Sequence, residues 1–143
     1  ATPLFLSAWN PTSAGVEAIE GEAFVANGEA SKALRIGDEL RSSDRLRVDE
    51  GGRVELLYAD RTRVVLEAGA IATLADKPFG GAKRVRVERG ELTASVSPQP
   101  AGAPMTFVTP HSEARVLGTE LLLDVGQDAT RLEVREGKVE FRR

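Results

Sequence analysis

The sequence contains no cysteine, one histidine, one tryptophan and one tyrosine among its 143 residues. The absence of cysteine excludes a disulfide framework and thiolate metal sites. A single histidine, His111, excludes a metal site built on a histidine pair and leaves little scope for a hydrolytic triad. One tryptophan and one tyrosine leave little material for the stacking surfaces that bind bases or sugars. No apolar run approaches the roughly 20 residues that span a bilayer.

Neither sign of charge dominates the chain. The formal net charge is -3, from 19 basic and 22 acidic residues. Because a general nucleic-acid binder usually carries a basic excess, we expect no nucleic-acid partner. The length suits one domain with its own apolar core. We expect an all-β domain over residues 15–143, preceded by an arm over residues 1–14 that is packed on the core, a plain linker, or the remnant of a signal peptide or membrane helix.

Alternation of apolar and polar residues with a period of two is abundant. The stretch KRVRVERGELTASVS places Val85 and Val87 on one face and charged side chains on the other, which is typical of a half-buried strand. Similar stretches recur about every 8–12 residues with turn signals between them. Helix patterning is confined to ASKALRIGDEL, where Gly37 ends any run. We therefore predict an all-β single domain of rolled or stacked short antiparallel strands, like a β-sandwich or β-helix.

An apolar–x–x–Gly–x–apolar signature occurs three times, in AIEGEAFV, VERGELTA and VREGKVEF. In each copy a strand runs into Glu or Arg and resumes after the glycine, which is Gly21, Gly90 or Gly137. Glycine suits a kink that needs positive φ or a close backbone approach. The copies fit stacked β-layers in which each one begins a new rung or hairpin. Chance recurrence of hairpin chemistry is the alternative.

Residues that could carry chemistry do not converge in the sequence. The acidic clusters at Asp38–Asp44 and Asp49–Glu50 lie beside glycines and lack the order of a calcium loop. We interpret them as turn residues whose carboxylates accept local backbone hydrogen bonds. His111 follows Pro110 in a turn, where we expect a solvated side chain. We therefore predict no catalytic, metal or cofactor site, and no enzyme.

Arginines recur on the expected strand faces opposite buried valines and leucines: Arg61, Arg63, Arg84, Arg86, Arg115 and Arg131. If neighbouring strands align them, they form a basic stripe that could bind an acidic ligand or partner. Alternatively they pair across strands with interleaved acids: Glu55, Glu88, Glu113 and Glu133. We favour pairing, because the acids alternate with the arginines along the chain.

Several stretches follow one another in a recognisable order, among them LRIGDEL, VRVERGELTASV, FVTPHSEARVLGTELLLDV and LEVREGKVEF. In this order the chain resembles FecR-type domains, the extracytoplasmic part of the iron-dicitrate regulator family, over about Gly15 to Phe141. Within the resemblance, Pro110 should end a strand, and Gly118 should mark a bulge or close contact. The family's usual Asp-Gly-Ser or Asp-Gly-Thr turn is replaced by Asp60-Arg61-Thr62, so we expect a wider connection there.

The resemblance implies a non-catalytic, periplasmic or extracytoplasmic sensory module of a membrane-anchored sigma-factor regulator. It would contact a protein partner, such as an outer-membrane transducer or another envelope protein, with any membrane contact made by segments outside this chain. The alternative is an envelope module that binds a ligand or glycan or serves as a scaffold. For protein contact we expect pairing at an exposed strand edge, TRLEVREGKVEF first and MTFVTP second. The candidate partner-binding residues are Arg131, Glu133, Arg135, Lys138, Glu140, Arg84 and Arg86.

Overall fold

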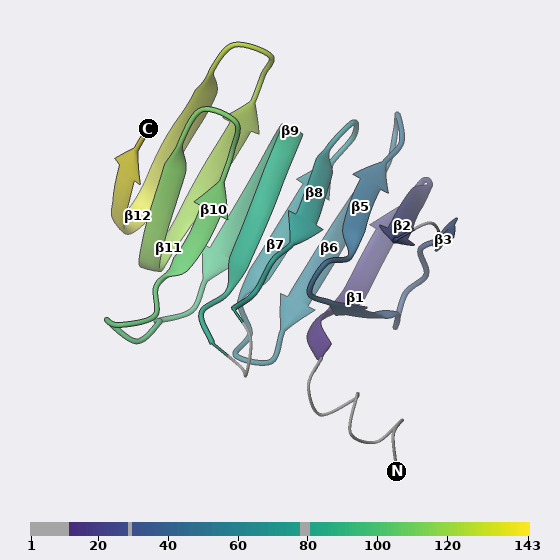
Figure 1. Ribbon diagram of the computed structural model, residues 1–143, viewed down its shortest axis with the longest axis horizontal. Coiled ribbons are helices and arrows are strands. Elements are labelled where there is room, and N and C mark those ends of the chain that lie inside the picture. The colour runs from purple at the N-terminus through teal and green to yellow at the C-terminus, as the bar shows by residue number, and fades with distance from the viewer. Residues whose placement is uncertain (1–11, 29, 78–80) are drawn as a thin grey trace.

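The computed structural model describes residues 12–28, 30–77 and 81–143, and every regular element in these ranges is a β-strand (Figure 1). The strands are β1 (Thr12–Glu20), β2 (Ala23–Asn27), β3 (Ala30–Ala33), β4 (Glu39–Arg41), β5 (Arg45–Val48), β6 (Arg53–Tyr58), β7 (Arg63–Glu67), β8 (Ile71–Leu74), β9 (Arg84–Val96), β10 (Met105–Val108), β11 (Glu113–Val125) and β12 (Thr130–Arg142). The all-β prediction is confirmed. Most of the predicted arm, residues 1–11, lies outside the described residues. No helix able to cross a membrane occurs in the described ranges.

The strands form one sheet that curls until two layers face each other. The layer nearer the viewer in Figure 1 contains β2, β5, β8, residues 84–89 of β9, and β10; we call it the front layer. The back layer contains β1, β6, β7 and residues 90–96 of β9. Strands β11 and β12 continue from one layer into the other. All neighbouring strands are antiparallel except β9 and β10, which run parallel.

Glycines mark the corners where the chain passes between the layers. Gly90 divides β9 with φ of 99°, and a Cβ there would overlap the Cα atom of Ala70 in the neighbouring turn. Gly137 divides β12 with φ of 95°, and a Cβ there would overlap the carbonyl oxygen of Gly118. Glycine alone tolerates both this conformation and this approach. Together with Gly21, which joins β1 to β2 at φ of 66°, these residues confirm the kinks predicted from the repeated signature.

The hydrophobic core lies between the two layers. In β6, Val54, Leu56 and Tyr58 point inward while the residues between them point outward, as the period-two pattern predicted. Both layers contribute large, fully buried side chains: Leu46, Leu74 and Phe107 from the front, and Leu56, Leu66 and Leu92 from the back. Each such burial contributes about 1.5–3 kcal/mol. The facing layers therefore account for most of the driving force for folding.

Two local predictions of the motif analysis are confirmed, and a third is wrong. The β6–β7 connection is not widened: the Arg61 amide donates to the Tyr58 carbonyl oxygen at 3.0 Å, and Arg61 itself adopts the positive φ, 71°, that usually favours glycine. Asp60 accepts a further hydrogen bond in this turn, from the Thr62 amide at 3.0 Å. Strand β10 ends at Val108, two residues before Pro110. The β11–β12 register shifts between Val116 and Gly118, which is the expected bulge.

Candidate functional site

Strand β12 is the longest unpaired edge in the described part of the sheet. Three strands have a single neighbour: β3 pairs only with β2, β4 only with β1, and β12 only with β11. Strands β3 and β4 contain four and three residues, whereas β12 contains 13. An unpaired edge offers a row of free backbone donors and acceptors to another chain, and short edges limit this hazard. The long edge at β12 confirms the first of the two predicted edges.

The second predicted edge, MTFVTP, is wrong. Strand β10 pairs with β11 on one side and with β9 on the other, so neither of its edges is free. The physical reason is the crossover of residues 97–104, which brings β10 back into the front layer parallel to β9. Met105 and Phe107 of β10 are completely buried there.

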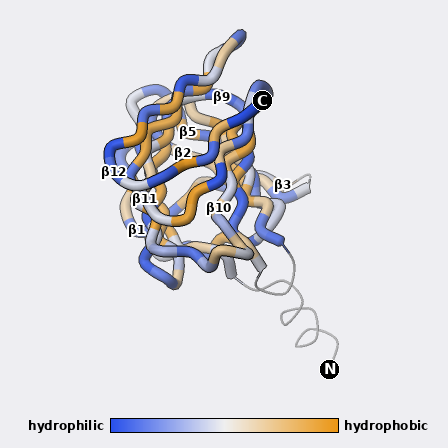
Figure 2. The backbone as a smooth tube through the Cα atoms, turned by 90° about the vertical axis from the view of Figure 1, so that its left-hand side faces the viewer, coloured by the Kyte–Doolittle hydropathy of each residue, from blue (hydrophilic) through white to orange (hydrophobic). Residues whose placement is uncertain are grey.

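The inner face of β12 carries an incompletely covered apolar strip. Residues opposite each other on paired strands share a face, and four β12 residues lie opposite core residues of β11: Leu132, Val134, Val139 and Phe141. Leu132 and Val139 are partly buried against the core. Val134 and Phe141 remain 40% and 43% exposed. Apolar and polar positions alternate along this strand in Figure 2, which looks onto the β12 end.

The outer face of β12 carries charges of both signs. Arg131 lies 3.8 Å from Asp124, and Glu140 lies 3.8 Å from Arg142, separations typical of weak surface pairs. Glu133, Arg135 and Lys138 have no ion-pair partner within the described residues. Three of the five predicted β12 residues are thus available to charges on another molecule.

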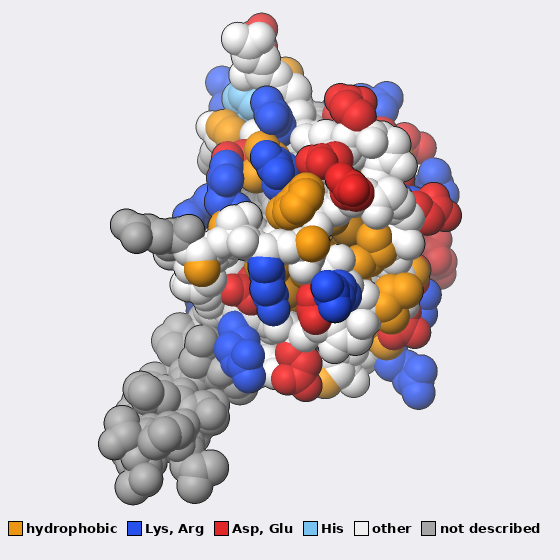
Figure 3. Space-filling model, turned by 90° about the vertical axis from the view of Figure 1, so that its right-hand side faces the viewer, with side chains coloured by type: hydrophobic (Ala, Val, Ile, Leu, Met, Phe, Trp, Pro, Cys, Tyr) orange, Lys and Arg blue, Asp and Glu red, His pale blue; other side chains and the backbone are white. Residues whose placement is uncertain are grey.

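The opposite end of the sandwich is closed by the chain itself. Residues 30–41 run from β3, beside the front layer, to β4, beside the back layer. Leu34 and Leu40 of this segment are buried in the core, 6% and 1% exposed. Figure 3 shows this end, where Lys, Arg, Asp and Glu side chains surround a few apolar ones. Only the β12 end combines a long free edge with an exposed apolar strip among the described residues.

Arg84 and Arg86 do not belong to the β12 edge. They lie on the outer face of the front layer, where β10 and β11 separate their strand from β12. The predicted pairing of arginines across strands holds for Arg63, which contacts Glu55 of β6 at 2.9 Å. Arg115 contacts Glu113 at 3.4 Å, but both residues lie on β11. The other pairs differ from the prediction: Glu88 pairs with Arg45, which was not among the predicted arginines, and Arg131 pairs with Asp124, which was not among the predicted acids. Arg84 and Arg86 form no ion pair with any residue that the structure describes.

The acidic clusters and the histidine organise turns. Asp38 accepts the Arg35 amide at 2.9 Å and Asp44 accepts the Arg41 amide at 2.8 Å, which confirms the interpretation of these two residues as turn residues. Asp49 of the second cluster lies 3.7 Å from Arg47. His111 differs from the solvated side chain that we predicted. It is half-buried, and its ring nitrogens lie 2.9 Å from Thr130 Oγ1 and 3.1 Å from the Gln127 carbonyl oxygen. It therefore links the 109–112 turn to the β11–β12 hairpin.

A polar cluster that the sequence did not reveal lies beneath the 97–104 loop. Lys83 Nζ lies 2.8 Å from Asp60 Oδ2, 3.0 Å from Gln99 Oε1 and 5.8 Å from the centroid of the Tyr58 ring. Burial by itself would raise the pKa of Asp60, but hydrogen bonds from Lys83, Gln99 and Thr62 outweigh it and hold that pKa below its usual range. Burial raises the pKa of Tyr58, whose hydroxyl has no hydrogen-bond partner within the described residues. In the sequence, the only hint of this cluster was the Asp60-Arg61-Thr62 turn, which departs from the family's usual residues.

Comparison with known proteins bears on this architecture. The sequence profile of the family described as FecR protein matches residues 44–140, more than half of the chain. Two crystal structures of a candidate anti-sigma factor from Parabacteroides distasonis are similar, with TM-scores of 0.60 and 0.61 and 26% identity. Each match covers 68% of this chain and 46% of the other, so this chain spans less than half of that protein. No curated protein matches the chain. Within the described ranges, no group of three or more potential metal ligands occurs.

Proposed function

Because the chain belongs to the FecR protein family, we propose that it is the signal-receiving domain of a membrane-anchored sigma-factor regulator. It acts outside the cytoplasm by contact with another envelope protein, such as an outer-membrane transducer. The similarity to a candidate anti-sigma factor supports this role. A fold built from rigid strands, with its exposed apolar strip at one end, suits a binding module.

The observation that carries the proposal is the β12 edge. Its free backbone N–H and C=O groups can form hydrogen bonds with an extended strand of the partner, which then extends the sheet beyond β12. The apolar strip formed by Leu132, Val134, Val139 and Phe141 is buried in the process. Burial of such side chains supplies affinity, and the backbone pairing sets the direction of the bound strand.

The partner segment has a definable chemistry. It is extended, with apolar side chains at alternate positions that pack on the inner strip of β12. The outward side chains of the partner segment carry charges opposite to those of Glu133, Arg135 and Lys138. These three residues have no ion pair with any described residue. Charge pairs of this kind favour the correct register and the correct partner more than they add affinity.

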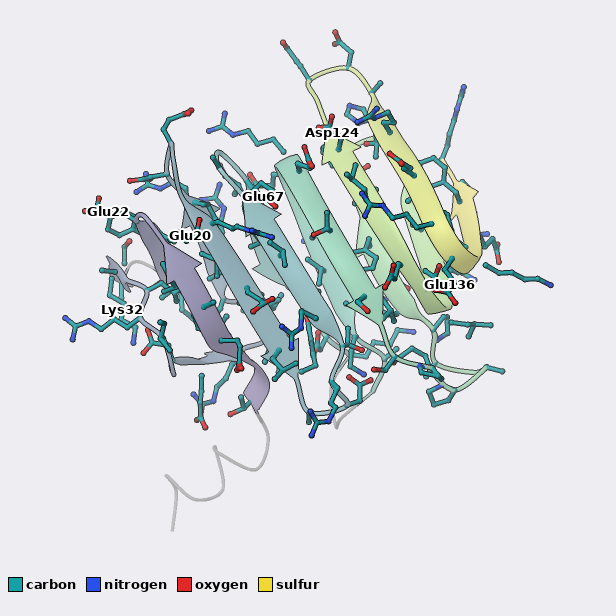
Figure 4. The ribbon with its side chains drawn as sticks, turned by 180° about the vertical axis from the view of Figure 1, so that it is seen from behind. Glu20, Glu22, Lys32, Glu67, Asp124 and Glu136 are labelled. Carbon is teal, nitrogen blue, oxygen red and sulfur yellow. The ribbon has the colours of Figure 1, made fainter. Side chains whose placement is uncertain are left out.

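The test is isothermal titration calorimetry of this domain with the signalling domains of envelope proteins encoded beside it. We expect Val134→Lys to weaken binding about tenfold or more, because an ammonium group would enter the apolar contact. Lys32→Glu is the matched control, since Lys32 is an exposed side chain of β3 at the opposite end of the molecule (Figure 4). It should bind like the parent.

Two different failures have different meanings. If none of the signalling domains binds, the proposed function is wrong. If one binds but Val134→Lys and Phe141→Lys leave the affinity unchanged while both proteins remain folded, the β12 edge is not the contact. Circular dichroism of each variant establishes that it is folded.

A further inference from the structure

A basic pocket lies on the outer surface of the front layer, away from β12's free edge. Its walls come from β9, β10 and β11, from residues 77, 82 and 83 before β9, and from residues 102–104 before β10. It has a volume of about 180 Å³. Four of its ten lining residues are basic and one is acidic: Lys77, Lys83, Arg84 and Arg115, with Glu113.

The register of the sheet places two arginines on either side of Thr106. Arg84 of β9 and Arg115 of β11 both lie directly opposite this residue of β10. Because Met105 and Phe107 point into the core, Thr106 and its two neighbours face outward. Three adjacent strands therefore hold the positions of both arginines, and the Arg84 amide is further anchored to Asp76 Oδ1 at 3.2 Å.

The charges around the pocket are only partly matched. Lys83 is neutralised by Asp60 at 2.8 Å, and Arg115 lies 3.4 Å from Glu113, which also faces Arg142 at 3.6 Å. The Arg84 guanidinium has neither a hydrogen bond nor an ion pair with the rest of the described chain. Thr106, only 9% exposed, likewise makes no side-chain hydrogen bond within the described ranges. A half-buried guanidinium and a neighbouring hydroxyl are thus available to one acceptor.

We propose that this pocket binds the oxyanion group of a small ligand, a carboxylate or a phosphate. A guanidinium presents paired N–H donors that match two oxygens of such a group, and the Thr106 hydroxyl adds a third donor. Arg84 and Arg115 bind from opposite sides, while Gly102, Ala103 and Pro104 of the Pro-rich loop enclose the ligand. This site does not include the free edge of β12, although its β11 wall adjoins β12, where Arg115 lies opposite Glu140 and Glu113 opposite Arg142.

The experiment is an NMR titration of the labelled domain with inorganic phosphate at constant ionic strength, followed by the same titration with malonate. We expect saturable shifts of the Arg84, Thr106 and Arg115 amides with a dissociation constant of about 1 mM or less. Arg84→Gln should weaken binding about tenfold or more, because one charge-assisted hydrogen-bonding group is removed. Arg86→Gln is the matched control, since Arg86 lies on the same strand and face but does not line the pocket.

The outcomes separate the possible explanations. Binding that is lost in Arg84→Gln and kept in Arg86→Gln supports the site, and the relative affinities for phosphate and malonate then identify its chemistry. Equal weakening by both substitutions would show a general charge effect and overturn the proposal. Shifts that rise linearly up to about 10 mM of either anion would also overturn it. Arg115→Gln provides a second variant with the same expected loss as Arg84→Gln.

Discussion

At the scale of single residues, the corners between the layers depend on glycine. Gly137 and Gly90 combine positive φ with a neighbouring backbone where a side chain would lie. Gly69 has a similar φ of 80°, but nothing lies within 4 Å of the position of a Cβ there. The three positions therefore separate the cost of the backbone conformation from the cost of the close approach.

We expect Gly137→Ala to lower the free energy of unfolding by about 2 kcal/mol or more, because the new methyl group adds an overlap to the conformational strain. Gly69→Ala should lose only about 1 kcal/mol, the cost of the conformation alone. Urea denaturation of both variants measures the difference. Equal losses would mean that the approach of Gly118 to Gly137 contributes nothing to the requirement for glycine.

Asp60 makes the free energy of unfolding depend on pH in the acidic range. Its pKa in the folded protein lies below its ordinary value, because hydrogen bonds from Lys83, Gln99 and Thr62 outweigh the effect of burial. A carboxylate of this kind stabilises the fold above the unfolded pKa of about 3.9, and this contribution is lost as the pH falls through the folded pKa. The side chain is partly exposed, so solvent screening reduces the effect.

We expect Asp60→Asn to lower stability at pH 7 and to flatten the dependence of the unfolding free energy on pH below about pH 4. Denaturant titrations between about pH 5 and pH 2 measure both effects. Glu22→Gln is the control, because Glu22 is an exposed carboxylate outside this cluster (Figure 4). A slope unchanged by Asp60→Asn would contradict the assignment.

At the scale of elements, the strands differ in how many neighbours they have. Strand β9 has a neighbour on each side both before and after the corner: β8 and β10 flank residues 85–86, and β7 and β11 flank residues 92–95. Strand β12 is paired on one side only. The alternation of side chains is almost the same in both strands, so it does not distinguish a central strand from an edge.

We expect the backbone amides of β12 that point away from β11, along the free edge, to exchange with solvent about 10³-fold faster or more than the amides of β9. Exchange from β9 requires global unfolding. Hydrogen exchange followed by NMR at low protein concentration measures this ratio. Uniform protection throughout β12 would mean that another molecule or a second copy covers the edge.

At the scale of the whole molecule, the two layers cannot fold separately. Strands β9, β11 and β12 belong to both, and short corners join β1 to β2, β5 to β6 and β7 to β8. The core consists of side chains from both layers packed against each other. Loss of one layer would therefore expose the apolar face of the other.

We expect one cooperative unfolding transition. Amide signals from β5 in the front layer and β6 in the back layer should disappear at the same urea concentration, and circular dichroism should give the same midpoint. Different midpoints for the two layers would refute this shared core.

The sequence by itself determined the all-β class, the positions of most strands, the glycine kinks and the family. These properties depend on local alternation, on the conformational freedom of glycine and on short motifs. It also identified the C-terminal strand as an edge, but it assigned a second edge to β10 and grouped Arg84 and Arg86 with the β12 residues. Only the tertiary structure decided which strands are neighbours, because pairing joins segments distant in the chain and leaves no local pattern. The same reason explains why the Lys83–Asp60 cluster was not predicted, and why the sequence could name Arg84 and Arg115 for a basic stripe but could not place them on either side of Thr106.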